Sequence, residues 1–271
     1  MADYNLYRGS IFHCIEDGSN VKPVYFQDGL MVVREGKIVE VGEYSELSVR
    51  FSSGGPIVHF KDSLIMPGFI DSHIHYPQYK VISSYGTSLL EWLNKYTFVE
   101  EQKFSDIDYA ARVAELFLDE LLKNGTTTAM TFCTSHKQSV DVFYSAAEKR
   151  NLRMIAGKVM MDRNAPDGLC DDIESSYADS KSLIEKWHNK GRLSYAVTPR
   201  FAPTSTEGQL IQAAKLLKEY PNTKNAKGVL LQTHLNENSD EIAWVKELYP
   251  QSKNYFDVYD NLGLSGTNSV F

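Results

Sequence analysis

This sequence of 271 residues lacks several features that define other classes of protein. No apolar stretch approaches the roughly 20 residues that a membrane-spanning helix needs, so no membrane partner is expected. Basic runs are absent as well. The 28 Lys and Arg residues stand against 35 Asp and Glu residues, and the formal net charge of −7 disfavours nucleic-acid binding. The N-terminus has neither the basic nor the apolar region of a secretory signal, and none is expected.

Cysteine is scarce. Cys14, Cys133 and Cys170 are odd in number and far apart, which disfavours a disulfide framework and a cysteine-based metal site. Such residues are typical of free thiols in a reducing compartment, and we therefore expect a cytoplasmic protein. Apolar residues make up 42% of the chain and charged residues 23%, which is the ordinary composition of a folded globular protein.

Residues 1–66 favour β structure. The segments 30–33 and 38–42 are apolar and flank a turn that contains Gly36, as two strands of a hairpin would. No helical periodicity of useful length occurs in this part of the chain.

From residue 64 onward, strand patterns alternate with helix patterns. We expect strands at 64–74, 127–133, 153–161, 193–198 and 228–235, and helices at 105–123, 138–150, 171–190, 207–220 and 239–248. Ser105 is the expected N-cap of the first of these helices. The alternation indicates βαβ units around a parallel sheet, about five of them and the edge of a sixth. Two architectures remain open at this point, an open α/β sheet and a truncated (β/α)8 barrel.

The residues at the ends of two expected strands point to a metal site. His73 and His75 lie two apart on one strand and can therefore present their imidazoles on one face. His234, at the end of the fifth strand, can supply a third nitrogen, and Glu237 lies close behind it. Imidazole nitrogens are ligands of catalytic zinc, which keeps one position open for water. At the end of the fourth strand, Arg200 and Phe201 offer hydrogen-bond donors and a stacking surface.

The segment Met66–His75 resembles the entry motif of the amidohydrolase superfamily. Four further blocks, at 89–98, 157–164, 199–204 and 232–237, resemble its guanine deaminase family, as does Gln78 after the entry motif. The resemblance implies an α/β fold of the (β/α)8 TIM-like barrel class, truncated here after about five and a half units, with a small N-terminal β-sandwich segment. Residues 1–66 would be the sandwich part and residues 67–271 the N-terminal portion of the barrel. The implied activity is the hydrolytic deamination of guanine to xanthine and ammonia in purine catabolism, by a homodimer with one Zn²⁺ per chain.

The resemblance also implies roles for individual residues. His73, His75 and His234 match zinc ligands, and Glu237 matches the proton shuttle of catalysis. Gln78, Arg200 and Phe201 match the purine pocket, together with His234 and Glu237, and Arg200 would address the carbonyl oxygen of guanine. The family takes a further histidine from the sixth strand and an aspartate from the eighth, which would lie past residue 271. We therefore expect the 271-residue chain to lack activity.

Several alternatives stay open. Lys158 is a candidate for a carbamate that bridges two metal ions, and His136 is a candidate for substrate contact, although a loop histidine is the simpler interpretation. Trp92 and Tyr96 are expected to pack a lid loop rather than to contact purine. The substrate could be another aminated heterocycle, and the chain could be an inactive or scaffold form. The other deaminase design, which needs a C-x-x-C zinc motif, is excluded because no such motif occurs.

Overall fold

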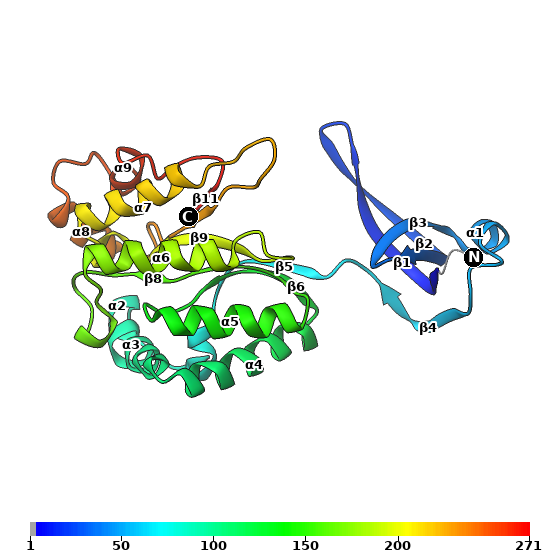
Figure 1. Ribbon diagram of the computed structural model, residues 1–271, viewed down its shortest axis with the longest axis horizontal. Helices are drawn as coiled ribbons and strands as arrows, with labels where there is room; N and C mark the ends of the chain where they lie inside the picture. The colour runs from blue at the N-terminus through cyan, green and yellow to red at the C-terminus, as the bar shows by residue number, and fades with distance from the viewer. Residues whose placement is uncertain (1–3) are drawn as a thin grey trace. The chain divides into compact units, whose positions relative to one another are not determined.

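A computed structural model describes residues 4–271 and divides the chain into two compact units, with the boundary between Gly68 and Phe69. Figure 1 shows both units. Among the described residues, none of the helices combines the length and apolarity required to traverse a lipid bilayer.

The first unit is a four-stranded sheet with the order β3-β2-β1-β4. Its strands are β1 (Asn5–Asp17), β2 (Asn20–Arg34), β3 (Lys37–Glu43) and β4 (Ile57–Ile65). The predicted hairpin is present: β2 and β3 pair antiparallel, and the turn between them has positive φ at Glu35 and Gly36. The helix α1 (Tyr44–Arg50) was not predicted, because its seven residues are too few to show a helical period. It buries Leu47 against Leu6 and Leu30.

The second unit contains a parallel sheet whose strands follow one another in chain order, β5-β6-β7-β9-β10-β11, with β8 paired to β9. These strands are β5 (Phe69–His75), β6 (Thr126–Phe132), β7 (Arg153–Gly157), β8 (Val159–Met160), β9 (Ser194–Pro199), β10 (Leu230–Gln232) and β11 (Ser269–Val270). Such an order means that every crossover steps in the same direction, as in a (β/α)8 barrel, whereas a doubly wound open sheet reverses its order. The structure thus settles the open alternative in favour of barrel topology.

Helices connect these strands and pack beside one another in chain order, α4 against α5, α5 against α6 and α6 against α7 (Figure 1). They are α4 (Ile107–Lys123), α5 (Lys137–Lys149), α6 (Ile173–Trp187), α7 (Glu207–Glu219) and α8 (Ser239–Leu248), followed by the short α9 (Tyr255–Asp260). One prediction at a helix end was wrong. The N-cap of α4 is Asp106, whose carboxylate accepts the backbone N–H groups of Asp108 and Tyr109, while the Ser105 hydroxyl bonds back to the Gln102 carbonyl.

The segment between β5 and α4, expected as a loop, is mostly helical. It contains η1 (Tyr76–Val81), α2 (Leu89–Trp92), η2 (Leu93–Thr97), α3 (Phe98–Glu101) and η3 (Gln102–Ser105). These turns are too short for a detectable periodicity, and η2 is a π-helical stretch that breaks the 3.6-residue pattern. Leu93 and Phe98 of this segment pack with Phe132, at the end of β6, and Phe201, which follows β9. The segment therefore lies over the carboxyl ends of the strands, where barrel enzymes carry their sites.

Candidate metal centre and ligand cavity

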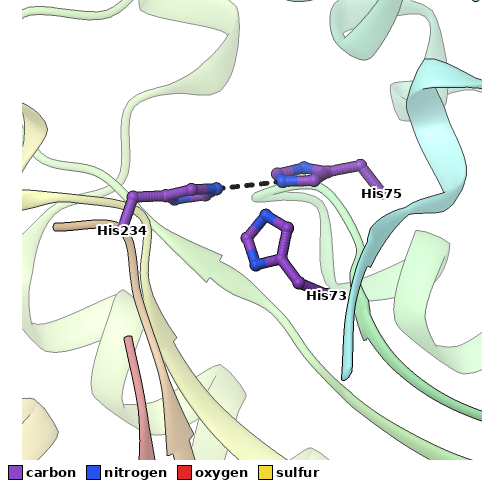
Figure 2. A group of neighbouring side chains, drawn as sticks. All are labelled: His73, His75 and His234. Carbon is purple, nitrogen blue, oxygen red and sulfur yellow. Dashed lines mark hydrogen bonds between the residues drawn. The ribbon is translucent and has the colours of Figure 1, made fainter. Parts of the chain in front are cut away.

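Three histidines converge at the carboxyl ends of β5 and β10. His73 and His75 lie on β5, and His234 lies two residues beyond the end of β10. Their rings face a common centre in Figure 2, and one nitrogen atom from each lies within 4.8 Å of the others. The structure thus brings together side chains that lie far apart in the sequence, since His75 and His234 are separated by 159 positions.

Hydrogen bonds orient the two buried rings. The Nε2 atoms of His75 and His234 lie 3.0 Å apart (Figure 2), and Nδ1 of His234 lies 2.6 Å from the Arg200 carbonyl oxygen. Because a carbonyl only accepts, Nδ1 of His234 carries the proton and Nε2 presents a lone pair to the centre. The His75 ring stacks on Phe132 at 4.4 Å, and its Nδ1 is a buried atom without a hydrogen-bond partner among the described residues.

All three imidazoles are held in the neutral form. Burial lowers the pKa of His73, lowers that of His75 well below its ordinary value, and lowers the pKa of His234 to about 3. The positive charge of Arg200 lowers the pKa of His75 and His234 further. A neutral imidazole, unlike an imidazolium, has a nitrogen lone pair with which to bind a metal ion.

The residues present fit a divalent metal ion. An ion about 2.0–2.1 Å from each nitrogen needs these atoms roughly 3–3.5 Å apart, and the two buried Nε2 atoms meet that condition. The bond from Nδ1 of His234 to a backbone carbonyl is the usual outer contact of a metal-binding imidazole. Three nitrogen donors leave a position for water or substrate, as catalytic zinc sites do.

A cavity of about 360 Å³ opens beside the histidines. The seven residues that the family resemblance assigns to the metal and purine sites all line it: His73, His75, Gln78, Arg200, Phe201, His234 and Glu237. Apolar side chains complete the wall, among them Leu89, Trp92 and Leu93 from the helical segment. The three histidines thus share one cavity with hydrogen-bond donors and aromatic surfaces, which is the usual composition of a small-molecule site.

Arg200 is buried and paired. It is 2% exposed, and its Nη1 lies 2.9 and 2.8 Å from the two carboxylate oxygens of Glu101, which is itself fully buried. The guanidinium carbon lies 5.1 Å from the centroid of the Phe98 ring. Burial raises the pKa of Glu101, and the charge of Arg200 opposes that rise.

Glu237 is held by a second carboxylate. The backbone N–H groups of Glu237 and Asn238 donate to one oxygen of Glu241, and the Tyr255 hydroxyl donates to the other. Desolvation raises the pKa of Glu237, the neighbouring charge of Glu241 raises it further, and Arg200 opposes both. A carboxyl group with a raised pKa is suited to give and take protons near neutral pH.

The structure shows the contacts of the other candidate residues that the sequence suggested. The Lys158 amine is buried against Asp171 and is 1% exposed, so it is engaged in an ion pair. The His136 ring bonds to Thr134 and to the Gly168 carbonyl and does not line the cavity. Trp92 packs in the helical segment as expected but also lines the cavity, whereas Tyr96 does not line it.

Comparisons with known proteins agree with this arrangement. Residues 64–271 match the model of the amidohydrolase family. The chain belongs to the amidohydrolase family. This amidohydrolase is 51% identical over 247 residues to the guanine deaminase of Escherichia coli K12, a match that covers 91% of the chain and 55% of the relative.

Two solved structures extend the likeness. The E. coli guanine deaminase matches with a TM-score of 0.89 at 46% identity, over 98% of this amidohydrolase and 60% of that chain. The guanine deaminase of C. acetobutylicum, solved with guanine bound in its active site, matches with a TM-score of 0.88 at 34% identity, over 98% and 61%. The present chain thus spans a little over half the length of these relatives.

Sequence reasoning missed three residues of the amidohydrolase site. Glu101 pairs with Arg200, Glu241 holds the backbone of Glu237, and Phe132 stacks on His75, and none of the three was singled out from the sequence. A signal for Glu101 did exist, because an arginine at the end of a buried strand requires a carboxylate partner. No local pattern says which of the many acidic residues supplies it.

Proposed function

We propose that this polypeptide belongs to an enzyme that hydrolyses guanine to xanthine and ammonia, with one zinc ion held by His73, His75 and His234. The observation that carries the proposal is the single cavity in which these three imidazoles meet Arg200 and Glu237. The high identity to guanine deaminases over most of the chain supports guanine as the substrate.

A zinc ion at this centre would lower the pKa of water from about 15.7 toward 7 and so provide a nucleophile at neutral pH. The protein's own residues then orient the reaction. Glu237, with its raised pKa, would carry a proton from the attacking water to the ring nitrogen beside C2 and later to the departing ammonia. Glu241 and Tyr255 would keep the Glu237 backbone at the cavity wall.

Purine recognition would fall to three other residues. Arg200 would donate to the carbonyl oxygen of guanine, Gln78 would bond to the ring edge, and Phe201 would contact the ring. Adenine carries an amino group where guanine carries the carbonyl, and it would leave the buried arginine facing another donor. Such a mismatch discriminates strongly between ligands.

Further parts of the proposal concern the whole protein. We propose a cytoplasmic homodimer. Light scattering of the purified protein tests whether it is a dimer.

The test of the proposed function is ligand binding by the zinc-loaded chain. Equilibrium dialysis would compare guanine with adenine and cytosine after metal content has been measured. We expect about one zinc per chain and guanine affinity at least about tenfold above that for adenine. A chain that binds zinc and prefers adenine or cytosine would be a deaminase for another heterocycle, and the guanine assignment would be wrong.

A further inference from the structure

A buried ion pair connects the cavity wall to the short helix α3. Glu101 is the last residue of α3, and its two oxygens meet a single nitrogen of Arg200, Nη1, at 2.9 and 2.8 Å. Both side chains are almost completely removed from solvent. Two charges are buried in this way only when their geometry is good, because neither can recover its hydration.

The pair leaves part of the guanidinium group available. Arginine has five N–H donors in a rigid planar fork, and both contacts with Glu101 leave from Nη1. Within residues 4–271, Nε and Nη2 form no hydrogen bond, and neither is a buried atom without a partner. Since Arg200 lines the cavity, these donors are the ones that a ligand there can reach.

The same helix contacts the guanidinium group through a second residue. Phe98 and Glu101 are three residues apart on α3 and therefore share one face of the helix. The Phe98 ring lies 5.1 Å from the guanidinium carbon, while the Glu101 carboxylate fixes one of its edges. One helix face thus contacts the Arg200 head group at two points, through the Phe98 ring and the Glu101 carboxylate.

We propose that Glu101 is a positioning residue for recognition of the purine carbonyl: by holding Nη1 of Arg200, it turns Nε and Nη2 toward the ligand. The inference rests on the proposed function and deepens it, because it says how the same site distinguishes its substrate. Recognition of the carbonyl then depends on α3 being seated against the end of β9. The helical segment 76–105 is thereby part of substrate selection.

The experiment uses the zinc-loaded chain and two ligands, guanine and 2-aminopurine, which is guanine without the carbonyl oxygen. Glu101→Gln removes the charge that holds Nη1 while keeping the size of the side chain. We expect guanine affinity to fall at least about tenfold and 2-aminopurine affinity to stay within about threefold. A purely structural role would weaken the binding of both ligands equally.

Glu100→Gln is the matched control. Glu100 lies on the same helix and is also buried, but it pairs with Lys103 and Tyr109. This variant should keep the guanine preference of the wild type. If Glu101→Gln does not fold, Glu101→Asp keeps the charge but draws the guanidinium back by the length of one carbon–carbon bond. We expect it to lower the guanine preference several-fold.

The outcomes separate the two proposals. A wild-type chain that prefers guanine, together with a Glu101→Gln or Glu101→Asp variant that keeps the full preference, overturns the positioning role and leaves the proposed function intact. A wild-type chain that binds zinc but shows no preference for guanine over 2-aminopurine overturns the recognition of the carbonyl, and the role of Glu101 with it.

Discussion

At the scale of single residues, hydrogen bonds to backbone atoms decide what the histidines can do. His234 is held by the Arg200 carbonyl in the tautomer that points a lone pair at His75 and His73. His136 lies near the same strand ends, but both of its ring nitrogens are occupied, by Thr134 and by the Gly168 carbonyl. Residue type alone does not distinguish these two histidines.

This difference predicts the metal content of two variants. His75→Ala removes one of three donors and should lower zinc affinity by at least about a hundredfold, so that dialysed protein retains little metal. His136→Ala removes an imidazole outside the cluster and should keep about one zinc per chain. Elemental analysis after dialysis checks both, and equal zinc loss in the two variants would refute the assignment of the ligands.

At the scale of elements, the sequence-based predictions and the structure differ mainly at the ends of helices and strands. Periodicity located α4 and its neighbours well, because amphipathic helices of more than ten residues repeat their pattern several times. The exact start of α4 depended instead on which of two adjacent polar residues faces the first turn. Asp106 does so and Ser105 does not.

The N-cap of α4 can be tested by a pair of substitutions. Asp106→Ala removes the acceptor for two backbone N–H groups and should reduce the free energy of unfolding by about 1 kcal/mol. Ser105→Ala removes only a bond to the Gln102 carbonyl and should cost less than about 0.5 kcal/mol. Urea unfolding measures both, and a larger effect for Ser105→Ala would restore the sequence-based prediction.

A buried ion pair joins the junction of β7 and β8 to the segment before α6. Lys158 is 1% exposed, and its partner Asp171 is mostly buried, so desolvation raises the pKa of that carboxyl while Lys158 opposes the rise. Asp171→Asn would leave a buried amine without its counter-charge and should cost about 3–5 kcal/mol. Glu148→Gln breaks the exposed pair with Lys190 and should cost less than about 1 kcal/mol. Equal effects in thermal unfolding would contradict this reading of burial.

At the scale of the whole molecule, buried neutral histidines connect stability to pH. The folded pKa values of His75 and His234 lie below the unfolded value of about 6.5, so below that pH the unfolded chain binds more protons than the folded chain. The two neutral histidines therefore make their full contribution to the free energy of unfolding above pH 6.5. That contribution falls as the pH is lowered below this value.

This coupling of protonation to folding predicts a measurable slope of the free energy of unfolding against pH. In metal-free protein, each of these two histidines should lower the free energy of unfolding by up to about 1.4 kcal/mol per pH unit between pH 6 and pH 5. Trp92, Trp187 and Trp244 all lie in the second unit, so tryptophan fluorescence reports the unfolding of that unit. A denaturation midpoint that stays constant or rises over this interval would show that the histidines are not buried in the neutral form.

The alternation of strands and helices, the turn at Gly36 and the placement of His73, His75 and His234 at strand ends were all available from the sequence alone. Each depends on local periodicity or on residues a few positions apart, and the family motifs added the barrel topology. The helical segment 76–105 was not available, because its turns are short and partly π-helical.

Only the tertiary structure decided which groups meet. Arg200 pairs with Glu101, which lies 99 positions away in the sequence, and His75 contacts His234, which lies 159 positions away. Local propensity contains no information about such pairs, since their partners are chosen by the order of the strands and by the cost of leaving a buried charge or a buried nitrogen unpaired. The sequence by itself therefore determined the elements and the candidate ligands, and the packing of strands and helices determined the chemistry that surrounds them.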